Sequence, residues 1–129
     1  MQTVIWTQTF ETQARRCRLS DDELKDIVSV ISDDPLSGDI IAGTGGARKI
    51  RHAGRGQGKS GGYRTIHYFG GDDVPVFLLA IYGKGTKANL TKAEKNELAK
   101  VLPLIADAYR KRAREAARKL ARRRKRRKE

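Results

Sequence analysis

One run of nine residues, 74–82 (VPVFLLAIY), is almost continuously apolar and constrains the fold more than any other stretch of the 129-residue chain. A strand with one face in water alternates apolar and polar side chains, whereas a strand buried on both faces does not. The run therefore predicts a central strand in a sheet that carries a layer of structure on each side. Because Pro75 has no backbone N–H, we expect it at the start of this strand.

Patterns on either side of this run predict the other elements. Residues 3–9 are rich in β-branched side chains and predict a first strand. Residues 10–18 and 20–34 have apolar side chains at helical spacing and predict a helical hairpin. Ser20 and Glu23 have the spacing of a capping box, and Pro35 and Gly38 end the second helix.

Two further strands and a C-terminal helix complete the expected elements. Residues 39–46 read as a loop, and residues 48–52 and 63–69 as strands. Thr91 and Glu94 form a second capping box, which opens a helix that Pro103 should kink or split. The helical pattern resumes as far as Leu120, beyond which repulsion between cations should fray the end.

Positive charge is concentrated at the C-terminus. The chain has a net charge of +13, of which residues 110–129 contribute +11 and residues 1–109 only +2. A polycation of this density favours nucleic acid or another anionic surface. We find no apolar run long enough to span a membrane, no secretory signal and only one cysteine, Cys17, so we expect a cytoplasmic protein without a membrane partner.

A second basic region lies in residues 43–64, which hold eight of the 13 glycines, six Lys or Arg and no Asp or Glu. Glycine permits close backbone approach to an anion. If the strands pair as neighbours, cations from them and from the following loop converge on one surface. Among these cations, Arg64 should have the side chain whose rotamer is best fixed by its neighbours. The plainer alternative is a solvated basic face.

Other motifs favour structural roles. Residues 53–60 and 56–61 fit relaxed nucleotide-binding patterns, but such motifs need a following helix and here a strand follows, so we expect a hairpin loop. His52 and His67 could form an acid–base pair, although strand alternation predicts that His67 packs in the core. No Cys/His spacing indicates a metal, and Asp72 and Asp73 read as turn formers.

Two motifs resemble a known family. GTGG-x-RK-x-R at residues 43–51 and GKSGG-x-R at residues 58–64 are similar to the HigB-like branch of the RelE/HigB toxins of bacterial type II toxin–antitoxin modules. The resemblance covers about residues 2–102 and leaves out the tail from Ala106. It implies an α+β domain with the order strand, two helices, three strands and helix, whose twisted, mostly antiparallel sheet is backed by the N-terminal helices. We accordingly expect a toxin domain at 1–105 and a basic helical extension at 106–129.

The resemblance also implies an activity: a ribosome-dependent mRNA endonuclease that acts in the ribosomal A site without a cofactor. A cognate antitoxin, of the helix-turn-helix type, is the implied protein partner. The motifs carry the family's catalytic positions over to Lys49, Arg51, Arg64 and Lys84. Further RNA-binding positions are Arg48, Arg55, Lys59, Tyr82 and Lys87. Some relatives use a tyrosine near the chain end, where this chain has Leu90, so that role is vacant or passes to Tyr82.

Cleavage of RNA by its own 2′-OH needs alignment, a proton acceptor and charge stabilisation at phosphate. We expect Arg64 and Lys84 at the scissile phosphate, Lys49 and Arg51 on the RNA backbone, and a lysine whose pKa is depressed by neighbouring cations as the base. The alternatives are a ribosome-independent nuclease and a non-enzymatic RNA- or ribosome-binding module of the same fold. The basic tail either binds ribosomal RNA phosphates or is a solubilising extension.

Overall fold

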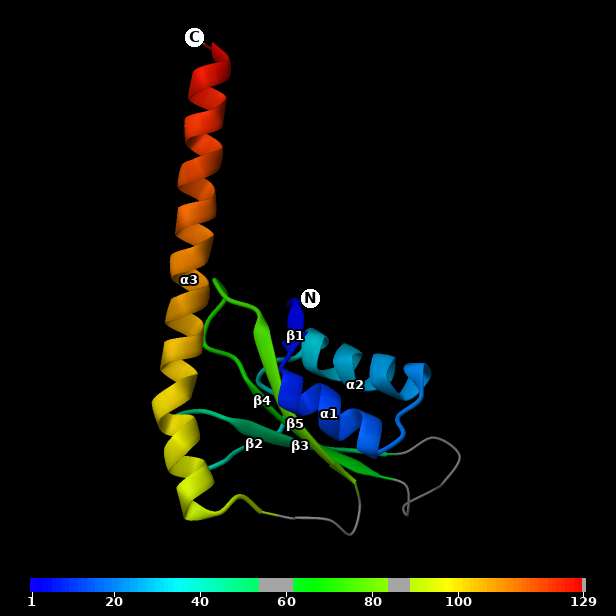
Figure 1. Cartoon of the computed structure of the whole chain (residues 1–129). Helices are drawn as coiled ribbons and strands as arrows, with labels where there is room; N and C mark the ends of the chain where they lie inside the picture. The colour runs from blue at the N-terminus through cyan, green and yellow to red at the C-terminus, as the bar shows by residue number, and fades with distance from the viewer. Residues whose placement is uncertain (54–61, 84–88, 129) are drawn as a thin grey trace.

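A computed structural model describes residues 1–53, 62–83 and 89–128 (Figure 1). Its elements follow in the order β1 (Val4–Trp6), α1 (Gln8–Arg16), α2 (Asp21–Asp33), β2 (Asp39–Ile40), β3 (Arg48–His52), β4 (Tyr63–Tyr68), β5 (Val76–Gly83) and α3 (Lys92–Lys128). The strands described form one sheet in the order β1-β5-β4-β3-β2, with β1 parallel to β5 and every other pair antiparallel. The predicted α+β class and mostly antiparallel sheet are confirmed.

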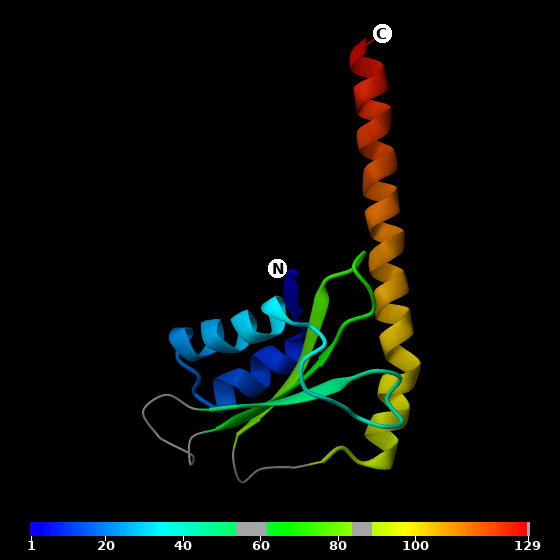
Figure 2. The ribbon, with the colours of Figure 1, turned by 180° about the vertical axis from the view of Figure 1, so that it is seen from behind.

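Hydrophobic cores lie on both faces of the sheet, and Figure 2 shows α1 and α2 on one side and α3 on the other. On the first side Phe10 and Ile31 pack with Leu78. On the second side Leu102 packs with Phe77. Strand β5 contributes buried side chains to both cores, so the apolar run does form a central strand covered on both faces.

The first strand is shorter than expected, because Thr7 begins a helix. We predicted a strand over residues 3–9, whereas β1 ends at Trp6 and α1 begins at Gln8. The Thr7 hydroxyl accepts a hydrogen bond from the Phe10 N–H and also donates one to the Leu79 carbonyl. This cap satisfies an orphan N–H group of the helix and ties the helix start to β5.

The predicted loop at residues 39–46 contains a short strand. Asp39 and Ile40 pair with Lys49 and Arg48 in an antiparallel ladder. The fully buried Thr44 closes this hairpin, because its hydroxyl donates to the Ile41 carbonyl at 2.7 Å and accepts the Ala47 N–H at 3.0 Å. Residues 39–46 carry no strand pattern of their own, so this pairing with residues 48 and 49 was not predicted.

Helix α3 is one continuous helix that contains Pro103, so the predicted split there is wrong. Proline removes the hydrogen bond to the carbonyl four residues earlier, which is that of Ala99. Both Pro103 and Ala99 are exposed, so water can reach that carbonyl, while the neighbouring Leu102 and Ala106 hold the helix on the sheet. The helix runs on to Lys128, past Leu120, and fraying of this end in free solution stays a prediction.

Candidate functional site

Pairing of β3 with β4 and β5 gathers cations on one face of the sheet. Arg51 lies opposite Arg64, and Arg64 lies opposite Tyr82 on its other side. Lys49 lies opposite Ile66 one pair further along. Opposite residues in an antiparallel ladder point to the same face, so these side chains share the face that α3 covers. The predicted convergence is therefore observed for Lys49 and Arg64, which line one hollow, whereas Arg51 lines another.

A hollow of about 170 Å³ opens between this face and the start of α3. We call it the cationic hollow. Its polar lining comes from Lys49, Arg64, Tyr82, Asn89 and Lys95. Its apolar lining consists of Ile40, Ile41, Ala42, Ile66 and Leu90. The hollow thus combines three cations, a phenol and an amide with a hydrophobic floor.

Lys95 is the functional candidate that sequence reasoning missed. The capping box at the start of α3 forms as predicted, with the Thr91 N–H bonded to the Glu94 carboxylate at 2.9 Å and the Glu94 N–H bonded to the Thr91 hydroxyl at 3.2 Å. This cap sets the first turn of the helix, and the stem of half-buried Lys95 passes close to Gly43. A cation near a helix N-terminus is electrostatically unfavourable, and that is the signal that could have drawn attention to it.

The electrostatic field of the hollow favours an anion. None of the described residues that line it is acidic, while Lys49, Arg64 and Lys95 are cationic. Arg64 and Lys95 are half-buried, so their charges are screened by water less than those of fully exposed side chains. A phosphate group is small enough for a space of this size, and its oxygens are suited to Arg and Lys donors.

The hollow does not include every predicted site residue. The Arg48 guanidinium points elsewhere and donates through one nitrogen to the carbonyls of Leu36 and Gly38, at 2.9 and 3.2 Å. Arg51 lines a separate hollow of about 230 Å³ together with Glu23 and Asp26. Four further predicted positions lie outside the described residues, namely Lys84, Lys87, Arg55 and Lys59.

Neither histidine reaches the cationic hollow. His52 Nε2 lies 2.8 Å from the Thr65 hydroxyl, and burial, followed by the charge of nearby His67, lowers the pKa of His52 from 6.5 to about 4. His67 is fully buried, donates from Nε2 to the Pro35 carbonyl at 2.8 Å, and has its pKa lowered mainly by burial. The prediction that His67 packs in the core is confirmed, and both rings belong to the face that α1 and α2 cover.

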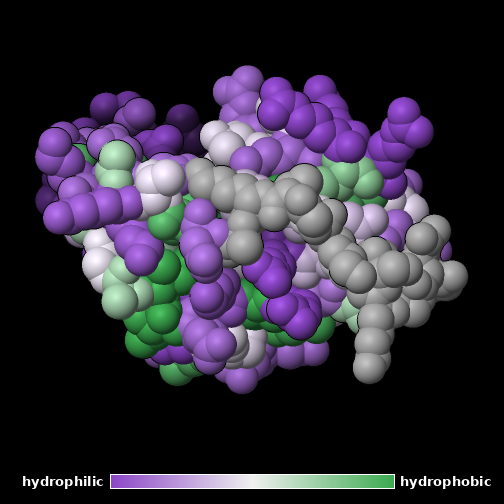
Figure 3. All heavy atoms as spheres, turned by 90° about the horizontal axis from the view of Figure 1, so that it is seen from below, coloured by the Kyte–Doolittle hydropathy of each residue, from purple (hydrophilic) through white to green (hydrophobic). Residues whose placement is uncertain are grey.

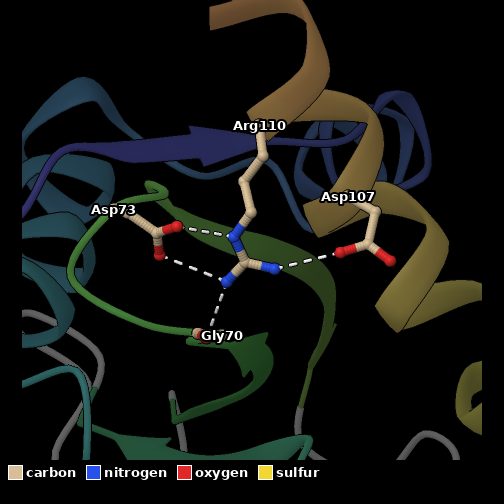
Figure 4. A network of polar contacts seen from close by, with 4 residues as sticks. All are labelled: Gly70, Asp73, Asp107 and Arg110. Carbon is tan, nitrogen blue, oxygen red and sulfur yellow. Dashed lines mark hydrogen bonds and ion pairs between the residues drawn. The ribbon is translucent and has the colours of Figure 1, made fainter. Parts of the chain in front are cut away.

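A polar network fixes α3 against the turn between β4 and β5 (Figure 4). Arg110 Nε donates to the Asp73 carboxylate at 2.6 Å, and one terminal nitrogen donates to Asp73 and to the Gly70 carbonyl at 3.2 and 3.1 Å. The other terminal nitrogen donates to Asp107 at 3.1 Å. The pKa of Asp73 is lowered, chiefly by the hydrogen bond from Arg110. Asp73 is therefore an anchor for α3 as well as a turn residue.

Viewed from the end where α3 begins, the surface is mostly hydrophilic, with hydrophobic side chains gathered in patches between the polar ones (Figure 3).

Across the residues that the structure describes, no set of His, Cys, Asp and Glu side chains is arranged to hold a metal ion. Within the same residues no helix combines the length and apolar character that crossing a membrane requires.

The fold and the cationic hollow define a small, basic α+β protein with a site suited to phosphate. A family profile described as the RelE toxin of the RelE/RelB toxin–antitoxin system matches residues 2–125, and the chain belongs to this family. It is thus the toxin component of a toxin–antitoxin system, in a family whose members are generally mRNA-cleaving endoribonucleases. The match extends well past residue 102, so our expectation that the tail from Ala106 lies outside the family pattern is wrong.

Proposed function

We propose that this protein is a ribosome-dependent mRNA endonuclease that cleaves translated mRNA in the ribosomal A site and so inhibits protein synthesis. The observation that carries the proposal is the cationic hollow, in which Lys49, Arg64 and Lys95 surround a space suited to one phosphate group. We also propose a cytoplasmic location and a cognate antitoxin of the helix-turn-helix type. The HigB-like branch remains a prediction from the two sequence motifs.

The proposed reaction uses the RNA's own 2′-OH. The 2′ oxygen attacks the adjacent phosphorus, a 2′,3′-cyclic phosphate forms, and the bond from phosphorus to the 5′ oxygen of the next nucleotide breaks. The 2′-OH loses its proton to a base, and the departing 5′ oxygen gains a proton. Negative charge grows on the phosphate oxygens during this step, so fixed cations around the phosphate lower the barrier.

The three cations and the tyrosine of the hollow each have a proposed role. Arg64 lies on a strand with neighbours on both sides, so its position is well fixed, and its guanidinium binds the scissile phosphate. Lys49 and Lys95 approach from β3 and α3 and bind the same phosphate or its neighbour. The Tyr82 hydroxyl can both donate and accept a hydrogen bond, which makes it the proposed proton-transfer group. Lys84, the predicted second phosphate contact, remains part of the proposal from sequence alone.

The shape of the site supports the proposed dependence on the ribosome. The hollow is open to solvent and holds about 170 Å³, too little to grip several nucleotides by itself. In-line attack requires a strained RNA backbone, and alignment of this kind is a large part of a catalytic barrier. The ribosome holds mRNA in a defined conformation and can supply that alignment.

The test is cleavage of a defined mRNA in a purified translation system, with and without ribosomes. Arg64→Ala should lower the cleavage rate about 100- to 1,000-fold, the usual effect of removing one transition-state donor. Lys95→Ala should lower it as well. The matched control is Arg16→Ala, which removes an exposed cation from α1, in the layer away from the hollow. This control should stay within a few-fold of wild type.

Three outcomes would change the conclusion. If Arg64→Ala cleaves within a few-fold of wild type, the hollow is not the catalytic site. Cleavage of naked RNA at the same rate would indicate a ribosome-independent nuclease. Ribosome binding without any cleavage by the wild-type protein would favour a non-enzymatic ribosome-binding module.

A further inference from the structure

The last part of α3 extends beyond the body of the protein. We call residues 111–128 the stalk. Residues 111–127 are all exposed, and Figure 1 shows this part of α3 projecting past the sheet and the other helices. At 1.5 Å per residue the stalk is about 27 Å long. No hydrophobic core packs against this part of the helix. Packing within the chain therefore does not explain why the stalk is there.

The stalk leaves the body at a fixed point. Tyr109 packs edge-on against Phe77 with their ring centroids 6.4 Å apart. The next residue, Arg110, binds both Asp73 and the Gly70 carbonyl, which belong to the turn between β4 and β5 (Figure 4). The direction of the stalk is therefore set relative to the strands that carry the cationic hollow. A flexible tail would have no such relation to the site.

The composition of the stalk specifies the chemistry of its partner. Residues 111–128 contain twelve Lys or Arg, one Glu and no Phe, Tyr, Trp, His, Asn, Gln, Ser or Thr. Without aromatic side chains it lacks the platforms on which the bases of a single strand usually stack. It also lacks the amides and hydroxyls that commonly help to read base edges. What it offers is cationic contact with phosphates, independent of base sequence.

The distribution of charge around the helix indicates a duplex. In its first half the cations Lys111, Arg114 and Arg118 follow helical spacing along one side, while small apolar side chains occupy the other. Residues 122–127 are six consecutive cations and so surround the helix completely. A helix that is cationic all round can meet phosphates on both edges of a groove at once.

We infer that the stalk is a second RNA-binding element, which binds the phosphates of double-helical ribosomal RNA while the cationic hollow acts on mRNA. This inference rests on the proposed function only where it names the RNA as ribosomal. Binding of duplex phosphates by the stalk does not depend on the proposed function. Phosphates would also neutralise the repulsion between neighbouring cations, so helix content in the stalk should rise on binding.

The experiment measures binding of the full-length protein to a fluorescent 20-base-pair RNA duplex across a salt series. One variant replaces Arg122, Arg123, Arg124, Arg126 and Arg127 by Gln. A second, Ala117→Pro, keeps every charge but breaks the helix. A control variant, Arg16→Gln with Lys25→Gln, removes two exposed cations from α1 and α2.

Each phosphate contact contributes about 0.9 to the slope of log affinity against log salt. Loss of five contacts should flatten the slope by up to about 4.5 and weaken binding at least about 100-fold at low salt. Ala117→Pro should weaken binding about tenfold, and the control should change neither quantity. An unchanged slope in the five-Gln variant overturns the inference. Unchanged binding by Ala117→Pro, or equal competition by polyglutamate at matched charge, also overturns it, because a flexible polycation would then suffice.

Cleavage separates this inference from the proposed function. The five-Gln variant should need more ribosomes to reach half-maximal cleavage but should reach the wild-type rate at saturation. If the wild-type protein never cleaves mRNA yet binds the duplex with the expected slope, the proposed function fails and the stalk inference stands. If the wild-type protein cleaves mRNA normally and the stalk variants bind the duplex as wild type does, the stalk inference fails and the proposed function stands.

Discussion

The buried His52 should make folding sensitive to acid. It is 8% exposed on β3, and its ring bonds the Thr65 hydroxyl on the paired strand β4. Burial, helped by the charge of His67, lowers the pKa of His52 from 6.5 to about 4. Above pH 6.5 the ring is neutral in both the folded and the unfolded chain. Between pH 6.5 and 4 the unfolded chain takes up a proton that the folded chain does not, so the folded state loses stability over this range.

The magnitude follows from the two pKa values of His52. A change from 6.5 to about 4 corresponds to about 3 kcal/mol of stability between pH values well above 6.5 and well below 4. About 2 kcal/mol of this should be lost between pH 8 and pH 5. The loss should stop below about pH 4, where both states bind the proton. The lowered pKa of His67 acts in the same direction.

Urea unfolding at pH 8 and pH 5 measures this effect. The wild-type midpoint should fall by about 1 M from this histidine alone. His52→Gln keeps a side chain that can bond Thr65 but cannot titrate, so its midpoint should fall by about 1 M less than that of wild type over the same range. Titration of His67 and the surface groups is common to both proteins and cancels in the comparison. If both midpoints fall equally, the assigned cause is wrong.

The same variant tests whether histidine takes part in catalysis. His52 and His67 lie on the opposite face of the sheet from the cationic hollow. At pH values where the variant is folded, His52→Gln should therefore keep the wild-type pH profile of mRNA cleavage. If the cleavage rate of the variant instead lost its dependence on pH on the acidic or the basic side, the histidine acid–base pair would again be the favoured mechanism.

Three further predictions concern the core, the hairpin and the hollow. Leu102→Ala should lower the free energy of unfolding by about 2–5 kcal/mol in urea titrations, because this fully buried side chain links α3 to the sheet. Gly38→Ala should lower the thermal midpoint, because Gly38 has φ +84° and a methyl group there would clash with the Lys49 carbonyl. Tyr82→Phe should slow cleavage about 100-fold or more with ribosome binding unchanged, if its hydroxyl transfers the proton.

Several features of this protein were determined by the sequence alone, because their causes are local. The Ser20 cap forms as predicted, with its hydroxyl accepting the Glu23 N–H at 3.1 Å, since both partners lie three residues apart on one helical turn. The alternation of Lys49 and Arg51 against Ile50 follows from the period of a strand, and the structure preserves it. The continuous apolar run predicted a strand with two covered faces, and β5 is that strand.

Tertiary structure decided which cations share a site. Arg48 is as basic in sequence as Lys49, but the carbonyls of Leu36 and Gly38 engage its guanidinium on the other side of β3. Lys95 enters the hollow from a helix some thirty residues after Arg64. Its place near a helix N-terminus marks Lys95 as unusual, but only the packing of α3 on the sheet brings it to the hollow.

The fixed exit of the stalk was likewise decided by tertiary structure. Arg110 and Asp73 are 37 residues apart, and each looks ordinary in its own segment. Contacts of this kind depend on how whole helices and strands pack against one another. Burial of side chains in the two hydrophobic cores decides that packing. Helical periodicity and charge predicted that a basic helix would exist. Only packing of α3 on the sheet decided where that helix leaves the body and where it points.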